Sequence, residues 1–195
     1  MPRVRFAVVG STGMIGRVHV DAINRLENAR LTAVAAVNPA PLIEQASQLH
    51  VRAYTDLDEL FRSPDVDAVA VATPHPSHLP IVLKAVRAGK HVLTDKPMAV
   101  TVSEAELMVE AARSAGVMLG VIYQNRFRPE CQKAREIVDQ GLLGKIYRTS
   151  MVHATARTEA YYRSRPWRGK WNGEGGGVLL NQGIHSLDLL QWFGG

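Results

Sequence analysis

The sequence predicts an α/β protein with a doubly wound parallel sheet, followed by a smaller second domain. Three observations predict it. Up to about residue 124, short apolar segments typical of buried strands alternate with helix-like segments over short connections. The first apolar segment runs into a glycine-rich turn, and the alternation stops beyond Gln124.

We expect about six strands, and the pattern places five of them at residues 4–9, 31–37, 68–72, 91–94 and 117–123. Between them we expect helices at 14–26, 41–49, from 55 onward and at 79–88, and one that starts with the capping-box spacing Thr101–Glu104 and stops at Gly116. This count is that of a complete Rossmann, dinucleotide-binding domain, which we place at residues 1–124.

Residues 125–195 form the predicted second domain, a partial α+β unit. Its pattern indicates a helix at 129–140, a turn bracketed by Gly141 and Gly144, a long strand at 146–156 and a final helix at 179–193.

Composition narrows the class of protein. No apolar run approaches the ~18 residues of a membrane span, and the amino terminus lacks the pattern of a signal peptide. With Cys131 as the single cysteine of the 195 residues, no internal disulfide can form. We therefore expect a cytoplasmic protein without membrane contact, and no cysteine or His-Glu pattern suggests a metal site.

The formal charge is +5, and part of the excess lies among aromatic residues at 163–171. Such a stretch is compatible with nucleic acid. No groove-reading motif accompanies it, so a loop that faces a phosphate-bearing cofactor or a polar substrate is the favoured interpretation.

The glycine-rich turn has the spacing G-x-x-G-x-x-G, from Gly10 through Gly13 to Gly16. This is one residue longer than the common dinucleotide-binding spacing, but a strand precedes it and a helix follows. At the end of the second strand stands Asn38, where an acid would hold the ribose of NAD. Asparagine does not repel a 2′-phosphate, so NAD and NADP both stay open, as does a simple turn before Pro39.

Two further strands end in chemically active residues. Residues 72–78 read Ala-Thr-Pro-His-Pro-Ser-His, and residues 95–97 read Asp-Lys-Pro. In an open parallel sheet, ligands bind at the carboxyl ends of the strands. Pro97 fixes its own φ and permits a cis bond, and either would hold the direction of Lys96.

These motifs together resemble the Gfo/Idh/MocA oxidoreductases over essentially the whole chain. The family's glutamate-lysine-proline motif is matched by Asp95-Lys96-Pro97, with aspartate in place of glutamate. Further matches are residues 13–19, 88–92, 125–127, 167–168 and 175–188.

The resemblance implies hydride transfer between a nicotinamide and a hydroxyl-bearing carbon of a sugar or cyclitol. It assigns the proton transfer to Lys96, Asn181 and His185. A lysine of ordinary pKa, about 10.4, is a poor base at neutral pH, so Lys96 either has a lowered pKa or orients the hydroxyl as a cation. Asn181 cannot take a proton and is expected to orient substrate or His185, which lies four residues on along one helix; Asp188 and Trp192 are expected to pack.

The resemblance and the glycine turn together imply a set of cofactor-binding residues. These are Gly10, Ser11, Thr12, Gly13, Met14, Ile15, Asn38, Ala72, Thr73, Pro74, His75, His78, Asp95, Lys96, Gln124, Trp167 and Arg168. For His75 and His78 a role in capping a helix is the alternative.

Family members are longer and use an open sheet for oligomer contacts, so we expect a truncated chain or a minimal variant that self-associates. A non-catalytic dinucleotide sensor, or a fragment that binds cofactor without turnover, are the alternatives to an active enzyme.

Overall fold

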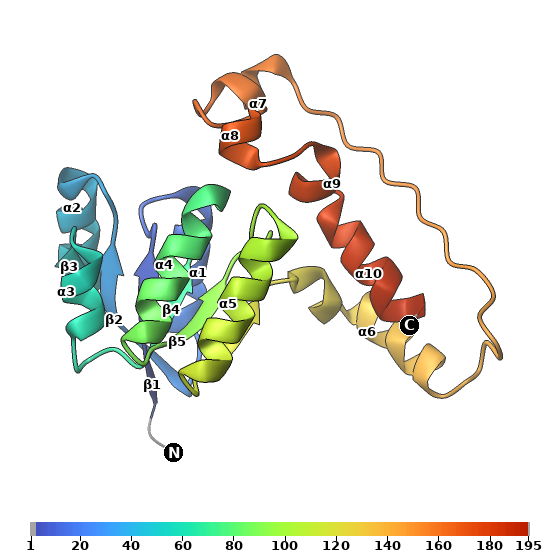
Figure 1. Cartoon of the computed structure of the whole chain (residues 1–195), viewed down its shortest axis with the longest axis horizontal. Coiled ribbons are helices and arrows are strands. Elements are labelled where there is room, and N and C mark those ends of the chain that lie inside the picture. Colours follow the sequence, from blue (N-terminus) through green and yellow to red (C-terminus); the bar gives the residue numbers. More distant parts are fainter. Residues whose placement is uncertain (1–2, 195) are drawn as a thin grey trace. The chain divides into compact units, whose positions relative to one another are not determined.

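The computed structural model describes residues 3–194. The chain forms two compact units, residues 1–121 and residues 122–195. Figure 1 shows the helices and strands of the two units.

The first unit is a six-stranded parallel sheet of order β3-β2-β1-β4-β5-β6. Its strands are β1 (Val4–Val9), β2 (Ala29–Ala35), β3 (Arg52–Tyr54), β4 (Ala68–Val71), β5 (His91–Thr94) and β6 (Leu119–Val121). Its helices are α1 (Met14–Asn24), α2 (Pro39–Leu49), α3 (Leu57–Arg62), η1 (His75–Ser77), α4 (His78–Arg87) and α5 (Val102–Ser114). This is the predicted doubly wound Rossmann sheet; β3, only three residues long, is the strand that the sequence pattern did not locate.

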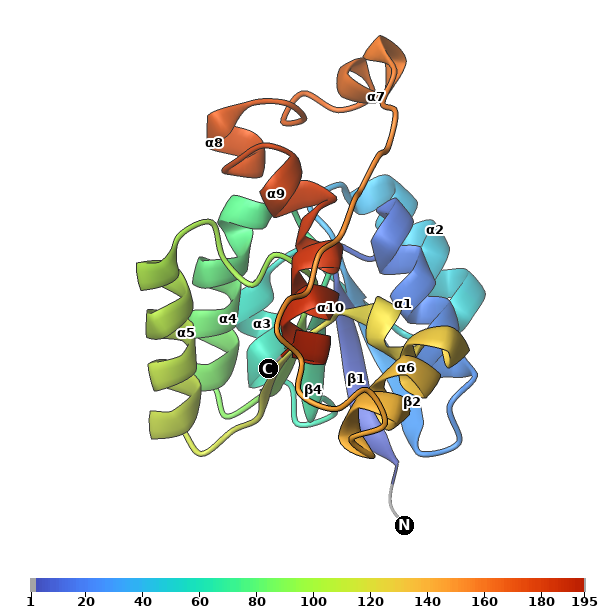
Figure 2. The same ribbon diagram turned by 90° about the vertical axis from the view of Figure 1, so that its right-hand side faces the viewer.

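Two apolar layers hold the sheet. Helices α1 and α2 cover one face, and α3, α4 and α5 cover the other (Figure 2). The strands β1 and β4 contribute to both layers, since successive side chains point to opposite faces. Val8 and Val69, for example, are fully buried in different layers. Because these strands are buried on both faces of the sheet, their sequences are almost continuously apolar.

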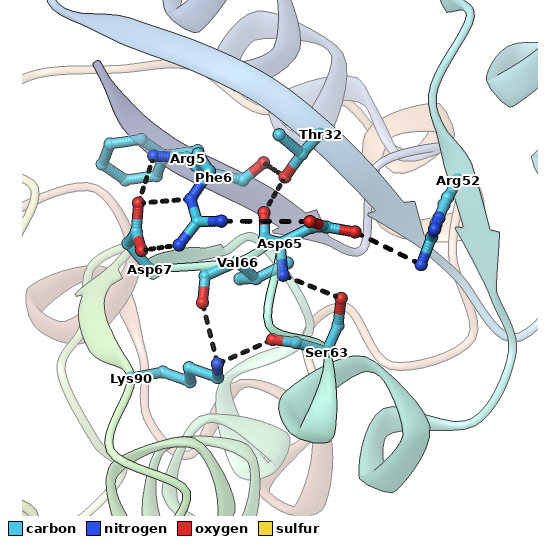
Figure 3. A network of polar contacts seen from close by, with 9 residues as sticks. All are labelled: Arg5, Phe6, Thr32, Arg52, Ser63, Asp65, Val66, Asp67 and Lys90. Atoms are coloured by element: carbon cyan, nitrogen blue, oxygen red, sulfur yellow. Dashed lines mark hydrogen bonds and ion pairs between the residues drawn. The ribbon is translucent and has the colours of Figure 1, made fainter. Parts of the chain in front are cut away.

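A polar network closes the amino edge of the sheet (Figure 3). Arg5 donates to Asp67 through its main chain at 2.8 Å and its guanidinium at 2.6 Å, and Thr32 donates to Phe6 O and Asp65 O. Lys90 donates to the carbonyl oxygens of Ser63 and Val66, each at 2.8 Å. This network lies at the edge opposite the strands' carboxyl ends, so Lys90 has a structural role there.

The second unit consists of short helices. They are η2 (Gln124–Phe127), α6 (Pro129–Asp139), α7 (Glu159–Arg163), α8 (Trp171–Glu174), α9 (Val178–Asn181) and α10 (Ile184–Gly194). The strand expected at 146–156 is not formed, because that segment has no hydrogen-bonded sheet neighbour within residues 3–194. Its apolar side chains include Tyr147 and Val152, which are 86% and 96% exposed.

The prediction of a single helix at 179–193 is also wrong. Helix α9 ends at Asn181 and α10 begins at Ile184. At the break, the N–H of Gly183 donates to the carbonyl of Val178 at 2.6 Å, one residue further back than in an α-helix. A Cβ on Gly183 would lie 3.0 Å from that oxygen, so the tight turn favours glycine.

Within residues 3–194 no helix is both long and apolar enough to cross a membrane. The same residues contain no group of three or more His, Cys, Asp or Glu side chains placed to hold a metal ion.

Candidate active site

The glycine turn connects the carboxyl end of β1 to the amino end of α1. Gly10 has φ +83°, and a Cβ there would lie 2.5 Å from Ala72 O. A Cβ on Gly16 would lie 2.1 Å from Gly10 O, so only glycine lets the helix approach the turn this closely. No described side chain caps the first turn of α1. The bare turn and uncapped N–H groups fit a dinucleotide pyrophosphate.

Not every residue of the turn offers a group to such a ligand. Ser11 is fully buried, and both its main-chain N–H and its hydroxyl face Ala35 O, at 3.2 and 3.4 Å. Ser11 therefore ties the turn to β2. Thr12 is half-buried, whereas Met14 and Ile15, at the start of α1, are 67% and 39% exposed.

Asn38 lies at the N-cap of α2, just beyond the carboxyl end of β2, and is exposed. Its side chain makes no capping hydrogen bond. Asn38 thus stands directly before Pro39 at the carboxyl end of β2, with its side chain exposed.

The loop after β4 is packed against the strand-end edge. Ala72 N–H donates to Val9 O at 2.9 Å, and the Ser77 hydroxyl donates to Thr73 Oγ1 at 2.8 Å. Pro74 is exposed, while His75 is 7% exposed. His78 begins α4, is fully buried, and contacts only main-chain oxygens through its ring nitrogens. The centre of its ring also lies 6.1 Å from that of His75.

Lys96 stands at the carboxyl end of β5. Asp95 N–H extends the sheet ladder to Val71 O at 2.9 Å, and Lys96 N–H donates to the Asp95 carboxylate at 2.8 Å. The peptide bond from Lys96 to Pro97 is cis, one of the two possibilities that the proline raised. Asp95 here orders the backbone of the motif.

His19 is a further candidate that the sequence analysis did not single out. It lies in α1, and burial lowers the pKa of its imidazole, an effect opposed by the nearby charge of Asp95. Its Nε2 is buried without a hydrogen-bond partner within residues 3–194. The family-like run at 13–19 contained the signal, but spacing alone did not relate His19 to Asp95.

The second unit assembles Asn181 into a polar cluster. Its amide donates to the Glu174 carboxylate and, at 3.4 Å, to the hydroxyl of Tyr161. Glu174 is 4% exposed and also accepts the N–H of Gly169 at 2.9 Å. Asn181 is therefore held in a fixed orientation, and Glu174 and Tyr161 are further members of the cluster that the sequence analysis missed.

Arg168 joins the same cluster. Its guanidinium lies 4.1 Å from the Tyr161 ring centre and 4.9 Å from that of Trp167, and it donates to the Tyr161 hydroxyl. Burial raises the pKa of Tyr161, but the hydrogen bond from Asn181 and the Arg168 charge outweigh it, and the net pKa is lowered. Arg168 Nε is buried with no partner in the described chain.

His185 lies in the first turn of α10, outside the Asn181 helix. Its ring meets the Tyr123 ring edge-on, with centres 6.4 Å apart. Burial raises the pKa of the Tyr123 phenol, and the charge of Asp188 adds to this effect. Gln124, the first residue of η2, is exposed. The two residues of the predicted pair thus belong to two helices rather than one face.

Comparisons with known proteins cover both units. Residues 4–123 match the model of an oxidoreductase family with an NAD-binding Rossmann fold, and residues 131–195 match a GFO/IDH/MocA C-terminal domain. Myo-inositol 2-dehydrogenase of Thermotoga maritima is 30% identical over 193 residues, 98% of this chain and 55% of that protein. A trans-1,2-dihydrobenzene-1,2-diol dehydrogenase of Mus musculus is 34% identical over 96% of this chain and 55% of its own.

Solved structures agree. The WlbA dehydrogenase from Bordetella pertussis, in complex with NADH and UDP-GlcNAcA, superposes with a TM-score of 0.89 at 32% identity, over 100% of this chain and 58% of that one. GenD2 from gentamicin A biosynthesis, in complex with NAD, has a TM-score of 0.84 at 27% identity, over 99% of this chain and 54% of that one. The chain spans a little over half the length of the relatives it matches.

Proposed function

The chain belongs to the Gfo/Idh/MocA family of oxidoreductases with an NAD-binding Rossmann fold, and on that premise we propose that it transfers a hydride between a nicotinamide and a hydroxyl-bearing carbon. The substrate class is a sugar, a cyclitol or a related polyol. Self-association into a homo-oligomer is part of the proposal.

One observation carries this proposal. The glycine turn and Lys96 lie at the carboxyl ends of β1 and β5, which belong to one sheet with only β4 between them. The glycine turn would hold the pyrophosphate of a dinucleotide. Residues 72–75, after β4, and Lys96, after β5, are the next groups along the same edge of the sheet and would hold the rest of the cofactor.

The chemistry follows from the residues. The nicotinamide, when bound, takes or gives the hydride. Oxidation of a carbinol also releases the hydroxyl proton, which needs an acceptor. In the first unit, Lys96 is the group proposed to donate a hydrogen bond to the substrate hydroxyl and to stabilise its developing charge. In the second unit, the imidazole of His185 is the proposed proton acceptor, and Asn181, held by Glu174, is proposed to orient the substrate.

The charge pattern bears on the substrate. Residues 145–170 carry the cations Lys145, Arg148, Arg157, Arg163, Arg165, Arg168 and Lys170 against one acid, Glu159. Such an excess favours ligands with negative charge. WlbA is described in complex with UDP-GlcNAcA, so nucleotide-linked and acidic sugars belong in the substrate panel beside inositols and neutral sugars.

The test is calorimetric titration of the full chain with NAD and NADP, followed by a polyol screen that reads nicotinamide fluorescence. We expect Lys96→Ala to abolish turnover and to change cofactor affinity by less than about tenfold, or ~1.4 kcal/mol. Lys84→Ala is the matched control, because Lys84 pairs with Asp58 on the surface.

Each failure has its own meaning. Full turnover in Lys96→Ala removes Lys96 from the mechanism. Cofactor binding without turnover of any substrate favours a dinucleotide sensor or a fragment that binds cofactor only.

A further inference from the structure

His78 bridges two strand-end loops. Its side chain is fully buried at the start of α4. Its Nδ1 lies 2.9 Å from the carbonyl oxygen of Pro97, and its Nε2 lies 2.9 Å from the carbonyl oxygen of Thr73. One ring thus joins the segment after β4 to the segment after β5.

Each of the two contacts needs a hydrogen on the ring nitrogen that makes it. A carbonyl oxygen only accepts hydrogen bonds, so the ring nitrogen facing it must carry a hydrogen. A neutral imidazole serves one of the two oxygens, and the doubly protonated ring serves both. Burying a polar group without such bonds costs free energy, and the bonds explain why a fully buried imidazole is tolerated here.

The two bonded oxygens flank the proposed site. Thr73 follows β4, and its hydroxyl accepts the bond from Ser77. Pro97 directly follows Lys96, whose own N–H is held by Asp95 at 2.8 Å. The backbone of Lys96 is therefore fixed on one side by Asp95 and on the other, through Pro97, by His78.

We propose that His78 is a positioning residue for Lys96: its Nδ1–H holds the Pro97 carbonyl and so sets where the lysine stands relative to the loop at Thr73. This inference rests on the proposed role of Lys96. It gives His78 a different part from the direct cofactor contact, and from the helix cap, that the sequence analysis considered.

Two substitutions separate the two bonds. The asparagine amide reaches about as far as Nδ1, and the longer glutamine amide reaches about as far as Nε2. His78→Asn keeps a donor for Pro97, whereas His78→Gln keeps one only for Thr73. We expect His78→Gln to lower kcat about 10²-fold, the usual effect of misplacing a catalytic group by ~1 Å, and His78→Asn to lower it less than about tenfold, with cofactor affinity retained in both.

His91→Gln is the matched control. His91 also bonds the main chain, accepting the N–H of Met118 at 3.0 Å, but at the amino end of the same strand β5. The kcat of His91→Gln is expected to equal that of the unmodified chain. Equal kcat in His78→Gln and His78→Asn, or an equal fall in His91→Gln, would overturn the proposal.

Nuclear magnetic resonance of the full chain provides a readout that does not depend on turnover. We expect a hydrogen on Nδ1 of His78 at neutral pH, and displaced amide signals of Lys96 and Met98 in His78→Gln but not in His91→Gln. A bare Nδ1 in the unmodified chain would refute the positioning role even if His78→Gln did not fold. Unmoved signals in folded His78→Gln would refute it even if no substrate were turned over. If the spectra are as expected but the unmodified chain turns over no substrate, only the proposed function is contradicted.

Discussion

Arg126 and Asp188 form a two-point ion pair across 62 residues, with Nε at 2.8 Å from Oδ2 and Nη2 at 2.5 Å from Oδ1. The Asp188 side chain is only 7% exposed. The hydrogen bond to the carboxylate raises the pKa of Arg126, whose guanidinium also lies 5.4 Å from the centre of the Trp192 ring. The pair joins η2 to α10, so Asp188 and Trp192 have the packing role that the sequence suggested, with a charge at its centre.

Arg126→Met should therefore destabilise the second unit, because it leaves Asp188 buried without its cation. Loss of one partner of a buried pair is strongly destabilising, and with Arg126 partly exposed we expect about 2 kcal/mol. The measurement is urea unfolding of the full chain. Arg163→Met is the control, since both members of its pair with Glu159 are about three-quarters exposed; it should change stability by less than about 0.5 kcal/mol. A similar loss in both variants would contradict the prediction.

Asp67 should make stability depend on acid pH. The hydrogen bond from Arg5 lowers the pKa of this carboxyl from 3.8 to about 2. Its folded pKa lies below its unfolded one, so the stabilisation is present above about pH 4 and is lost as the pH falls toward 2. Because Asp67 is partly exposed, we expect about 1 kcal/mol between the unmodified chain and Asp67→Asn at pH 7.

Thermal unfolding of both proteins from pH 2 to pH 7 checks this prediction. The difference in stability between the unmodified chain and Asp67→Asn should shrink steadily below pH 4. The control is Asp21→Asn, which removes an exposed carboxylate from α1. A constant gap between Asp67→Asn and the unmodified chain across that range would show that the Arg5 pair does not carry the effect.

The Rossmann unit was predictable because its signals are local. Each buried strand reads as an apolar run, and the glycine turn and capping box are written in consecutive residues. Strand β3 escaped because Arg52–Tyr54 has two exposed side chains and no apolar run. The second unit was harder to predict. Residues 146–156 have a strand-like composition but no pairing partner within residues 3–194, and composition does not report pairing.

The candidate site divides in the same way. The sequence could single out Lys96 and Gly16 as candidates because a strand end and a helix start are both visible in consecutive residues. The contacts of His78, Tyr161 and Glu174 could not be found, because each joins residues that are distant in sequence through side-chain geometry. Periodicity also overstated the Asn181–His185 helix, since a single Gly183 ends it.

Gly16→Ala should weaken cofactor binding. The added Cβ would lie 2.1 Å from Gly10 O and 2.7 Å from the Cα of Ser11, so the turn must move away from α1. We expect NAD affinity to fall more than about tenfold, with a stability cost of roughly 1–3 kcal/mol from overpacking. Calorimetry measures the first and urea unfolding the second.

Gly89→Ala is the control, because it strains the backbone at a glycine away from the proposed cofactor site. Gly89 has φ +73° but open space around its Cα, and it follows α4 at the other edge of the sheet. This variant should lose about 1 kcal/mol of stability and keep its affinity for NAD. Retained affinity in Gly16→Ala would mean that the cofactor does not use the turn.

Asn38→Asp should shift cofactor preference toward NAD. Asn38 is exposed at the end of β2 without a capping bond, and a carboxylate there accepts the ribose 2′-hydroxyl but repels a 2′-phosphate. We expect the ratio of the NADP and NAD dissociation constants to rise about tenfold, or ~1.4 kcal/mol. The control Asn28→Asp adds the same charge before β2, at the opposite edge of the sheet, and should leave the ratio unchanged. An unaltered ratio in Asn38→Asp would place the ribose elsewhere, because a fixed charge beside the phosphate must change the binding constant.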